Sequence, residues 1–389
     1  MKILLFYKNI IIDGGAERLL IEEYLAFKRL GYDVFLVTFE FNSNLAIGGE
    51  IKEEDVIVLK SKLWLSSIYQ FISLLKRNKG AHCIASSGFV ECYFARLFSG
   101  ANIHTRQHHP TSMDIKNSNK YSLLRRAEYQ NVLANTLEPG WIEHCRSNFS
   151  LRSILYFTFK DIIESRLAKL ANNVFVLSAY AQLEQDLFYS IKSEVIQGAL
   201  RCTAPKYNLV QSLQEDKALK VLSVCRLERQ KRVDKSLMAF SEFLKNHPEA
   251  KFYIGGRGPE ENYLRKIVYD LNIEKSVVFL GFIPDELLLD YFGSADIFIN
   301  LDWADFNITV YEALSVGTFV ITSNEGDCDE ILIAKNYITQ VNPHDSEGIV
   351  KALDSVSQRT LLFDQEEVSS RLEAYTWDNF CRSTLQFLQ

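Results

Sequence analysis

The sequence has few cysteines, and none are spaced in a way that would hold a fold together. The 389 residues contain seven, at positions 83, 92, 145, 202, 225, 328 and 381. Their number is odd and no two form a CxxC pair, which argues against a disulfide framework or a zinc site. Free thiols are typical of a reducing compartment, so the sequence predicts a cytoplasmic protein.

Long apolar runs are also absent. A membrane-spanning helix needs about 20 apolar residues, and charged residues interrupt every candidate segment. The N-terminal run of residues 1–13 is apolar, but no small-residue cleavage site follows it. The run therefore predicts a first β-strand rather than a signal peptide. The chain is expected to be a soluble or membrane-peripheral protein.

The chain has no excess of positive charge either. Its 43 Lys and Arg residues are outnumbered by 49 Asp and Glu residues, which gives a net charge of −6. This balance argues against broad nucleic-acid binding, so nucleic acid is not an expected partner. Hydrophobic residues make up 47% and charged residues 24%, as in a globular protein.

The alternation of predicted strands and helices indicates two α/β domains. A chain of this length exceeds one ordinary core. Short apolar segments alternate with helical patterns in both halves, which is typical of doubly wound parallel sheets. The predicted strands are Lys2–Tyr7, Val34–Thr38, Ile84–Ser86, Ile103–Arg106, Asn173–Ser178, Lys220–Cys225, Lys251–Ile254, Val277–Leu280, Ile297–Asn300, Thr318–Thr322 and Tyr337–Val341.

The domain boundary is predicted where this pattern breaks. Residues 200–218 contain a proline and a polar stretch and are the expected linker. The prediction is an N-terminal domain at 1–200 and a C-terminal domain at 218–370. Residues 371–389 are expected to form a helix that crosses back to the first domain.

Three signals between residues 221 and 330 occur in an order that suits a phosphate-binding site. Arg226 and Lys231 follow an apolar strand, where two cations can hold a diphosphate. A glycine turn at 255–259 follows the next strand and permits close backbone approach. A later helix carries Glu312, and the start of that helix can offer amide groups to an anion.

With these motifs placed, the chain resembles the family 4 glycosyltransferases of the GT-B fold, in which two Rossmann-like domains face each other across a cleft. The resemblance covers nearly the whole length and is strongest over 220–345. It includes the Gly14-Gly15 loop, the Gly-x-Gly-Pro turn at 256–259 and the Tyr-Thr-Trp segment at 375–377. It implies transfer of a sugar from a nucleotide diphosphate with retention of anomeric configuration. It also implies that the domain at 1–200 binds the acceptor and that the domain at 218–370 binds the nucleotide sugar.

The resemblance assigns roles to individual residues of this chain. The implied catalytic residues are His108, Arg226, Lys231, Asp305 and Glu312. The implied donor-binding residues are Gly14, Gly15, Gly256, Gly258, Phe282, Ile283, Asn307, Ile308, Thr309 and Glu312. His109 competes with His108 for the histidine near the donor sugar.

One departure from the family pattern lies before Glu312. The family has a glutamate eight residues upstream, where this chain has Ala304 followed by Asp305. Either Asp305 replaces the missing acid, or the sugar hydroxyls are held in another way. Donor identity and transfer geometry both depend on this difference.

The implied chemistry needs no metal and no cofactor, because the nucleotide sugar is itself a substrate. Charge grows on the departing diphosphate, and fixed cations and amide dipoles lower the barrier. The pair Asp327 and Asp329 is a weak metal signal, since two carboxylates lack a third ligand. Glu330 is the expected participant in that loop.

Residues 61–79 have features of a helix that lies on a membrane surface. Apolar positions recur at helical spacing, and Lys76, Arg77 and Lys79 cluster at the end, as in an interfacial helix. An ordinary helix packed on the sheet explains the same pattern. Peripheral contact with the cytoplasmic membrane face is a hypothesis for this segment.

Taken together, the sequence predicts a hexosyltransferase. The expected donor is a nucleotide diphosphate sugar of the GDP-mannose or UDP-glucose type, and the expected acceptor is a glycan or a lipid-linked molecule in surface polysaccharide or glycoconjugate assembly. A non-catalytic sugar-nucleotide or glycan-binding protein of the same fold is the alternative that Ala304 suggests. A GT-B epimerase or phosphorylase is disfavoured because no typical pyridoxal-binding lysine segment is evident.

Overall fold

The computed structural model describes residues 1–11, 15–42, 51–59, 63–107, 151–200, 206–214, 218–302, 306–324, 328–358 and 363–388. The chain divides into two compact units. The N-terminal unit comprises residues 1–198 and 377–389, and the C-terminal unit comprises 199–376. The sequence predicts a linker at 200–218 and a return from 371; in the structure the chain passes between units after Gly198 and after Thr376.

The N-terminal unit is built on a seven-stranded sheet in the order β5-β3-β1-β6-β7-β8-β9, with every pair parallel. Parallel sheets are covered on both faces, and the buried, apolar strands β1 and β6 at the centre agree with this. The strands are β1 Lys2–Phe6, β3 Asp33–Thr38, β5 Val56–Val58, β6 His82–Ala85, β7 Asn102–Arg106, β8 Val174–Val176 and β9 Glu194–Val195, with a separate pair β2 Asn9–Ile10 and β4 Glu40–Phe41.

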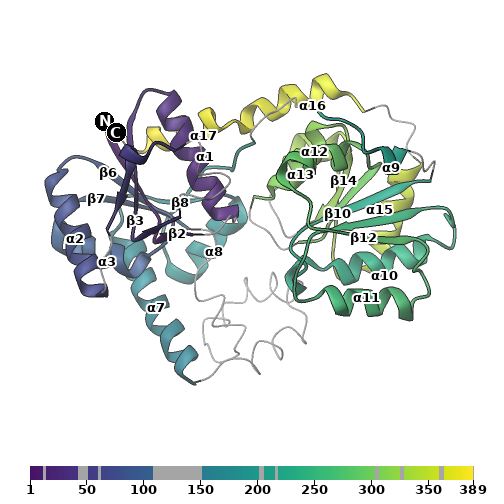
Figure 1. Ribbon diagram of the computed structural model, residues 1–389, viewed down its shortest axis with the longest axis horizontal. Coiled ribbons are helices and arrows are strands. Elements are labelled where there is room, and N and C mark those ends of the chain that lie inside the picture. Colours follow the sequence, from purple (N-terminus) through teal and green to yellow (C-terminus); the bar gives the residue numbers. More distant parts are fainter. Residues whose placement is uncertain are drawn as a thin grey trace. The chain divides into compact units, whose positions relative to one another are not determined.

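Helices cover both faces of this sheet. Figure 1 shows α2 and α3 on one face and α1 with α17 on the other. The core beneath α2 and α3 includes Phe6, Phe71 and Ile103, all fully buried. The helices of the unit are α1 Gly15–Arg29, α2 Trp64–Arg77, α3 Phe89–Ser99, α7 Leu151–Leu170, α8 Ala179–Tyr189 and α17 Trp377–Gln386, with a 3₁₀ turn η2 at Glu53–Asp55.

The C-terminal unit has a six-stranded parallel sheet in the order β12-β11-β10-β13-β14-β15. The order reverses beside β10, so the adjacent strands β10 and β13 send their connections to opposite faces. Ligands bind at such a switch point, beyond the carboxyl ends of the strands. The strands are β10 Lys220–Val224, β11 Lys251–Gly255, β12 Val277–Gly281, β13 Ile297–Asn300, β14 Phe319–Ser323 and β15 Ile338–Val341.

Helices also sandwich the second sheet. Figure 1 shows α10 and α11 on one face and α12 and α13 on the other. Apolar residues of α10, α11 and α15 join the sheet in one core that includes Phe240, Leu264 and Leu353. The helices are α9 Gln211–Gln214, α10 Val233–Phe243, α11 Glu261–Asp270, α12 Asp285–Gly293, α13 Ile308–Ser315, α14 Glu330–Ala334, α15 Ser346–Ser357 and α16 Gln365–Leu372, with 3₁₀ turns η4 Arg229–Lys231 and η5 Glu373–Tyr375.

The C-terminal helix α17 is bonded into the N-terminal unit through a buried ion pair. Glu23 of α1 pairs with Arg106 of β7, and both side chains are 0% exposed. Arg106 also donates to the Thr384 hydroxyl at 3.2 Å and lies 4.4 Å from the centre of the Phe380 ring. Since Thr384 and Phe380 belong to α17, this ion pair ties the end of the chain to the first sheet.

Candidate functional site

Strand β10 ends by presenting Arg226 to solvent. Leu227 next to it is 1% exposed and anchors the backbone, while the Arg226 side chain is 72% exposed. Its guanidinium pairs with Glu228, with 2.7 Å between Nη1 and Oε1. The backbone of Arg226 is therefore fixed at the edge of the sheet, and its cationic end remains in contact with water.

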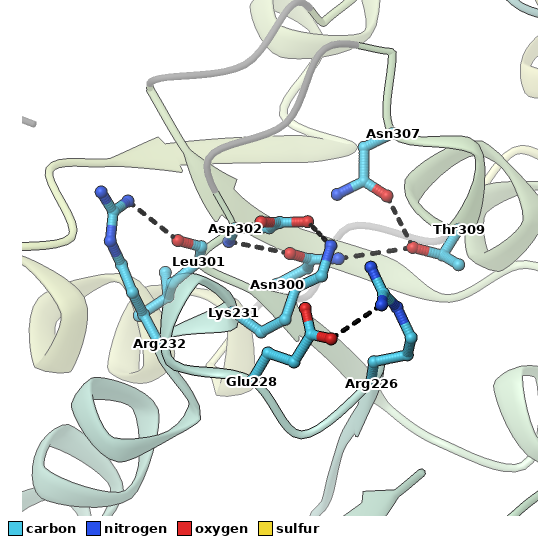
Figure 2. Close-up of polar contacts among 9 residues, drawn as sticks. All are labelled: Arg226, Glu228, Lys231, Arg232, Asn300, Leu301, Asp302, Asn307 and Thr309. Carbon is cyan, nitrogen blue, oxygen red and sulfur yellow. Dashed lines mark hydrogen bonds and ion pairs between the residues drawn. The ribbon is translucent and has the colours of Figure 1, made fainter. Parts of the chain in front are cut away.

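Lys231 comes from the same loop but has a different environment. Its ammonium forms an ion pair with Asp302, which lies just beyond the end of β13 (Figure 2). The Asp302 side chain is 3% exposed and that of Lys231 is 21% exposed. Because β10 and β13 are neighbouring strands, the fold places this cation and this acid at one edge of the sheet.

The glycine turn after β11 supports the loop that carries Arg226. Gly256 has φ of +120°, and a Cβ there would lie 1.8 Å from the carbonyl oxygen of Cys225. A Cβ on Gly258 would lie 2.2 Å from the carbonyl oxygen of Leu227, whose amide donates to Arg257 O at 2.9 Å. The sequence predicts close approach to a ligand; the structure shows close approach to the end of β10.

The start of α13 lies on the same side of the sheet as Asp302. The Asn307 side chain makes no capping bond to the helix; its Oδ1 accepts a hydrogen bond from the Thr309 hydroxyl at 2.7 Å. Asn300 Nδ2 in turn donates to Thr309 Oγ1 at 3.4 Å (Figure 2). A helix N-terminus carries partial positive charge, so this end of α13 adds to the potential of Lys231.

Three further predicted residues of this unit lie in α13 and just after β12. Glu312, one turn beyond the start of α13, is 8% exposed. Phe282 is 64% exposed, whereas Ile283 is 7% exposed and lies against Gly255. A Cβ on Gly255 would come within 2.5 Å of Ile283 Cδ1, so Ile283 fills the space beside the end of β11.

The structure does not describe several of the predicted residues. His108, Asp305 and Gly14 lie outside the described residues, as does Ala304. Gly15 is the first residue of α1 in the N-terminal unit. The roles of these positions remain predictions from the family resemblance.

Asp329, the one described member of the Asp327–Asp329 pair, acts within the protein. It caps α14 and accepts hydrogen bonds from Arg371 Nε and from the Tyr375 hydroxyl, each at 2.6 Å. Burial alone would raise the pKa of Asp329, but these bonds outweigh it and lower the pKa. Among the described residues no group of three or more His, Cys, Asp and Glu residues could hold a metal ion.

Two residues of this site escaped prediction from the sequence. Asp302 and Asn300 were assigned no role, although Asp302 follows an apolar strand, as Arg226 does. Their importance depends on β13 lying beside β10, and β11 and β12 separate these strands in the sequence. A polar residue just after each buried strand was the available signal.

The arrangement can hold an anion, and the described residues around it include no evident nucleophile. Arg226, Lys231 and the start of α13 are positively charged elements at this edge of the sheet; Arg232 lies there too, but it is only 9% exposed and donates to Leu301 O at 3.2 Å. Cys225 directly precedes Arg226 in the sequence, and burial raises the pKa of its thiol to about 12. A thiol in that state is not a nucleophile at neutral pH, so the site suits binding of a charged leaving group.

Comparisons with known proteins identify the fold first. The chain aligns over 100% of its length with the apo form of the lipopolysaccharide outer core galactosyltransferase WaaB, with a TM-score of 0.67, 15% identity and 99% of that chain covered. Anabaena HepE in complex with UDP and glucose aligns over 100% of this chain and 99% of its own, with a TM-score of 0.70 and 17% identity. The chain has the two-domain GT-B fold of glycosyltransferases.

The sequence comparisons then concern the C-terminal unit. Residues 207–371 match the family described as Glycosyl transferases group 1. An uncharacterized glycosyltransferase of Methanocaldococcus jannaschii is 30% identical over 187 residues, 46% of this chain and 47% of that protein. Alpha-monoglucosyldiacylglycerol synthase of Streptococcus pneumoniae is 29% identical over 171 residues, 43% and 38% of the two chains. The chain thus spans less than half the length of these two relatives.

Proposed function

We propose that this protein is a retaining glycosyltransferase that moves a hexose from a nucleotide diphosphate sugar to a glycan or lipid-linked acceptor. The observation that carries the proposal is the placement of Arg226, Lys231 and the start of α13 at the carboxyl edge of the second sheet. In α/β folds this edge is where phosphate groups bind. The match of residues 207–371 to group 1 glycosyl transferases supports the same activity.

In the proposed reaction the protein stabilises the leaving group. The bond between the anomeric carbon and the diphosphate oxygen breaks, and a bond to the acceptor hydroxyl oxygen forms on the same face. The acceptor proton passes to the departing diphosphate. Arg226 and Lys231 would neutralise the charge that develops on this group, so neither a protein nucleophile nor a metal is required in this scheme.

The direct test is donor turnover in variants of the two cations. Arg226→Ala and Lys231→Met are each expected to lower kcat by about 10²–10³, as when one donor to a developing anion is removed. Lys245→Ala is the matched control, because Lys245 is an exposed cation paired with Glu242 on another part of the unit. Activity like that of the wild type in either of the first two variants would contradict the assignment.

The identity of the acceptor is proposed from the names of relatives. Besides the diacylglycerol enzyme of Streptococcus pneumoniae, one relative from Arabidopsis thaliana belongs to a phosphatidylinositol N-acetylglucosaminyltransferase and is 23% identical over 166 residues. Both names include a lipid, whereas mannosylfructose-phosphate synthase and glycogen synthase, 28% and 27% identical to this chain, are named for sugars. We favour a lipid-linked acceptor for this protein because of helix α2.

Helix α2 supports such an acceptor, because it has the composition of a membrane-contacting helix. It contains no acidic residue, and its exposed residues include Leu65 and Tyr69, each 72% exposed, with Lys76 and Arg77 in the last turn. No helix in the described parts of the chain is long and apolar enough to cross a membrane. We propose that α2 rests on an anionic lipid surface.

Vesicle binding tests this proposal. The wild type is expected to sediment with vesicles containing anionic lipid at low salt, and Lys76→Gln/Arg77→Gln to sediment much less, because about 1 kcal/mol is lost for each cation near such a surface. Lys245→Ala should sediment like the wild type. No binding of the wild type at low salt would end the hypothesis.

A non-catalytic sugar-nucleotide-binding protein is the second candidate, and Ala304 in place of the family's glutamate favours it. The two candidates differ in one measurable respect. Nucleotide binding without donor hydrolysis, and without transfer to any member of a broad acceptor panel, would favour the binding protein.

A further inference from the structure

We propose that Asp302 is a positioning residue that fixes the ammonium of Lys231 and joins it to the start of α13 as one preorganised anion-binding unit. This inference rests on the proposed function, since it concerns how the same edge of the sheet would receive a diphosphate. Asp302 itself is not proposed to contact the nucleotide.

The burial of the Asp302–Lys231 pair is the first observation. The acid is 3% exposed, and the lysine, at 21%, is the more accessible partner. A lysine side chain has many rotamers, and ordering it costs conformational entropy. Because a buried carboxylate holds the ammonium, the lysine side chain is already ordered before any ligand binds. An ammonium also has three N–H donors, so one ion pair does not use its full capacity.

The second observation is the chain of hydrogen bonds that leads away from Asp302. The Asp302 amide donates to Asn300 Oδ1 at 2.9 Å, and Asn300 Nδ2 donates to Thr309 Oγ1 at 3.4 Å. The Thr309 hydroxyl donates to Asn307 Oδ1 at 2.7 Å. Figure 2 shows these side chains following one another from Lys231 to the first turn of α13. The cation and the helix terminus therefore share one set of supports.

The contrast with Arg226 shows what this support adds. Arg226 has an acidic partner in Glu228, but its side chain is 72% exposed and that of Glu228 is 29% exposed. An exposed pair of this kind is screened by water and holds its members only weakly. Arg226 can exchange Glu228 for a ligand, whereas the buried carboxylate of Asp302 holds the ammonium of Lys231 in place.

Charge repulsion by Asp302 would have the opposite effect on nucleotide binding, so the direction of the change in Kd distinguishes the two. Asp302 is negative, and a carboxylate near a diphosphate repels it. If repulsion prevailed, neutralising Asp302 would tighten nucleotide binding; if positioning prevails, neutralising it weakens binding. The burial of the acid behind the ammonium favours positioning, because the ligand would meet Lys231 first.

The experiment is a double-mutant cycle read by calorimetric titration with UDP, GDP and ADP. Asp302→Asn should raise the Kd of the nucleotide that the wild type binds by about tenfold, a typical coupling between contacting groups. In a Lys231→Met background the same change should raise Kd less than about twofold, because its effect passes through Lys231. Asp302→Ser repeats the test with a smaller side chain, should Asp302→Asn fail to fold.

The outcomes separate the two proposals. Binding by Asp302→Asn as tight as the wild type, or tighter, overturns the positioning role and leaves the proposed function standing. An equal loss with and without Lys231 also overturns it, because the effect would then be a general one on the fold. A wild type that binds none of the three nucleotides overturns both proposals.

Discussion

The two units of this chain contain parallel sheets of similar build, but they place their ionic groups differently. The central ion pair of the N-terminal unit, Glu23 with Arg106, is 0% exposed on both sides. In the C-terminal unit the cations at the edge of the sheet are 72% exposed at Arg226 and 21% at Lys231. The first pair thus anchors its unit, whereas the cations at the edge of the second sheet remain accessible.

The reason for the difference lies in what each pair contacts. Arg106 is enclosed by the Phe380 ring and the Thr384 hydroxyl of α17, so its charge has no route to a ligand. Arg226 and Lys231 lie beyond strand ends at a topological switch point, where a ligand replaces water. The buried Glu23–Arg106 pair therefore has a structural role, whereas the position of Arg226 and Lys231 at the sheet edge suits them for binding.

The largest expected effect comes from breaking the buried pair. Arg106→Met leaves the Glu23 carboxylate buried without its cation, and we expect a loss of about 3–5 kcal/mol in the free energy of unfolding. Urea denaturation measures this loss. The double change Glu23→Leu/Arg106→Met should regain most of it, since no unpaired charge remains.

The same measurement on the exposed pair sharpens the comparison. Glu228→Gln should change the free energy of unfolding by less than about 1 kcal/mol, because the pair is screened by water. A loss for Arg106→Met as small as that for Glu228→Gln would show that burial does not distinguish the two units.

A loss between these two is expected at the glycine turn of the C-terminal unit. Gly256→Ala introduces both a strained φ of +120° and a Cβ 1.8 Å from Cys225 O. We expect a loss of about 1–3 kcal/mol and weaker nucleotide binding, because the loop of Arg226 must shift. Gly281→Ala is the matched control, since its φ is +70° and its Cβ would meet nothing within 4 Å. Nucleotide binding that is equal in the two variants would contradict the supporting role of Gly256.

A further effect, confined to the N-terminal unit, is a pH dependence at His104. Burial is the main cause that lowers the pKa of His104 from 6.5 to about 3, with His82 and Arg96 adding to it. His104 Nε2 lies 3.1 Å from His82 Nδ1, its Nδ1 lies 3.0 Å from Asn173 Nδ2, and burial lowers the pKa of His82 too. The folded unit therefore holds both rings neutral at neutral pH.

The sign of this dependence follows from linkage. Below pH 6.5 His104 is protonated in the unfolded chain but stays neutral in the folded unit. The free energy of unfolding therefore falls progressively as the pH drops from 6.5 to about 3. Asp329 in the C-terminal unit behaves differently: its pKa is lowered below 3.8, so its contribution is full above 3.8 and is lost only in stronger acid. Calorimetry between pH 7 and 4 should show a weakening that His104→Asn reduces. An unchanged pH slope in that variant would contradict the assignment.

The strands and helices that the sequence predicted best are those with strong patterns. The GT-B fold was predicted correctly, because buried apolar strands such as β1, β6 and β13 alternate with amphipathic helices. The pair β2 with β4 and the edge strands β5 and β9 were not predicted, since segments of two or three residues carry no period. Tertiary hydrogen bonding, rather than local preference, creates them.

The sequence indicated that Arg226 and Lys231 follow a strand, but it did not indicate how they are bonded. Arg226 and Lys231 were recognised from their position after a strand, yet no local pattern indicated that one would be exposed and the other paired with Asp302. That pairing depends on which strands are neighbours. The glycines of the turn were recognised as necessary, but the surface they approach is Cys225 and Leu227.

The most direct test of the central claim is a crystal structure of the protein soaked with UDP or GDP. The account predicts diphosphate oxygens within hydrogen-bonding distance of Arg226 and Lys231, in front of the first turn of α13, with the Asp302–Lys231 pair intact. Phosphates bound elsewhere, or both cations turned toward solvent beside a nucleotide that does not touch them, would contradict it.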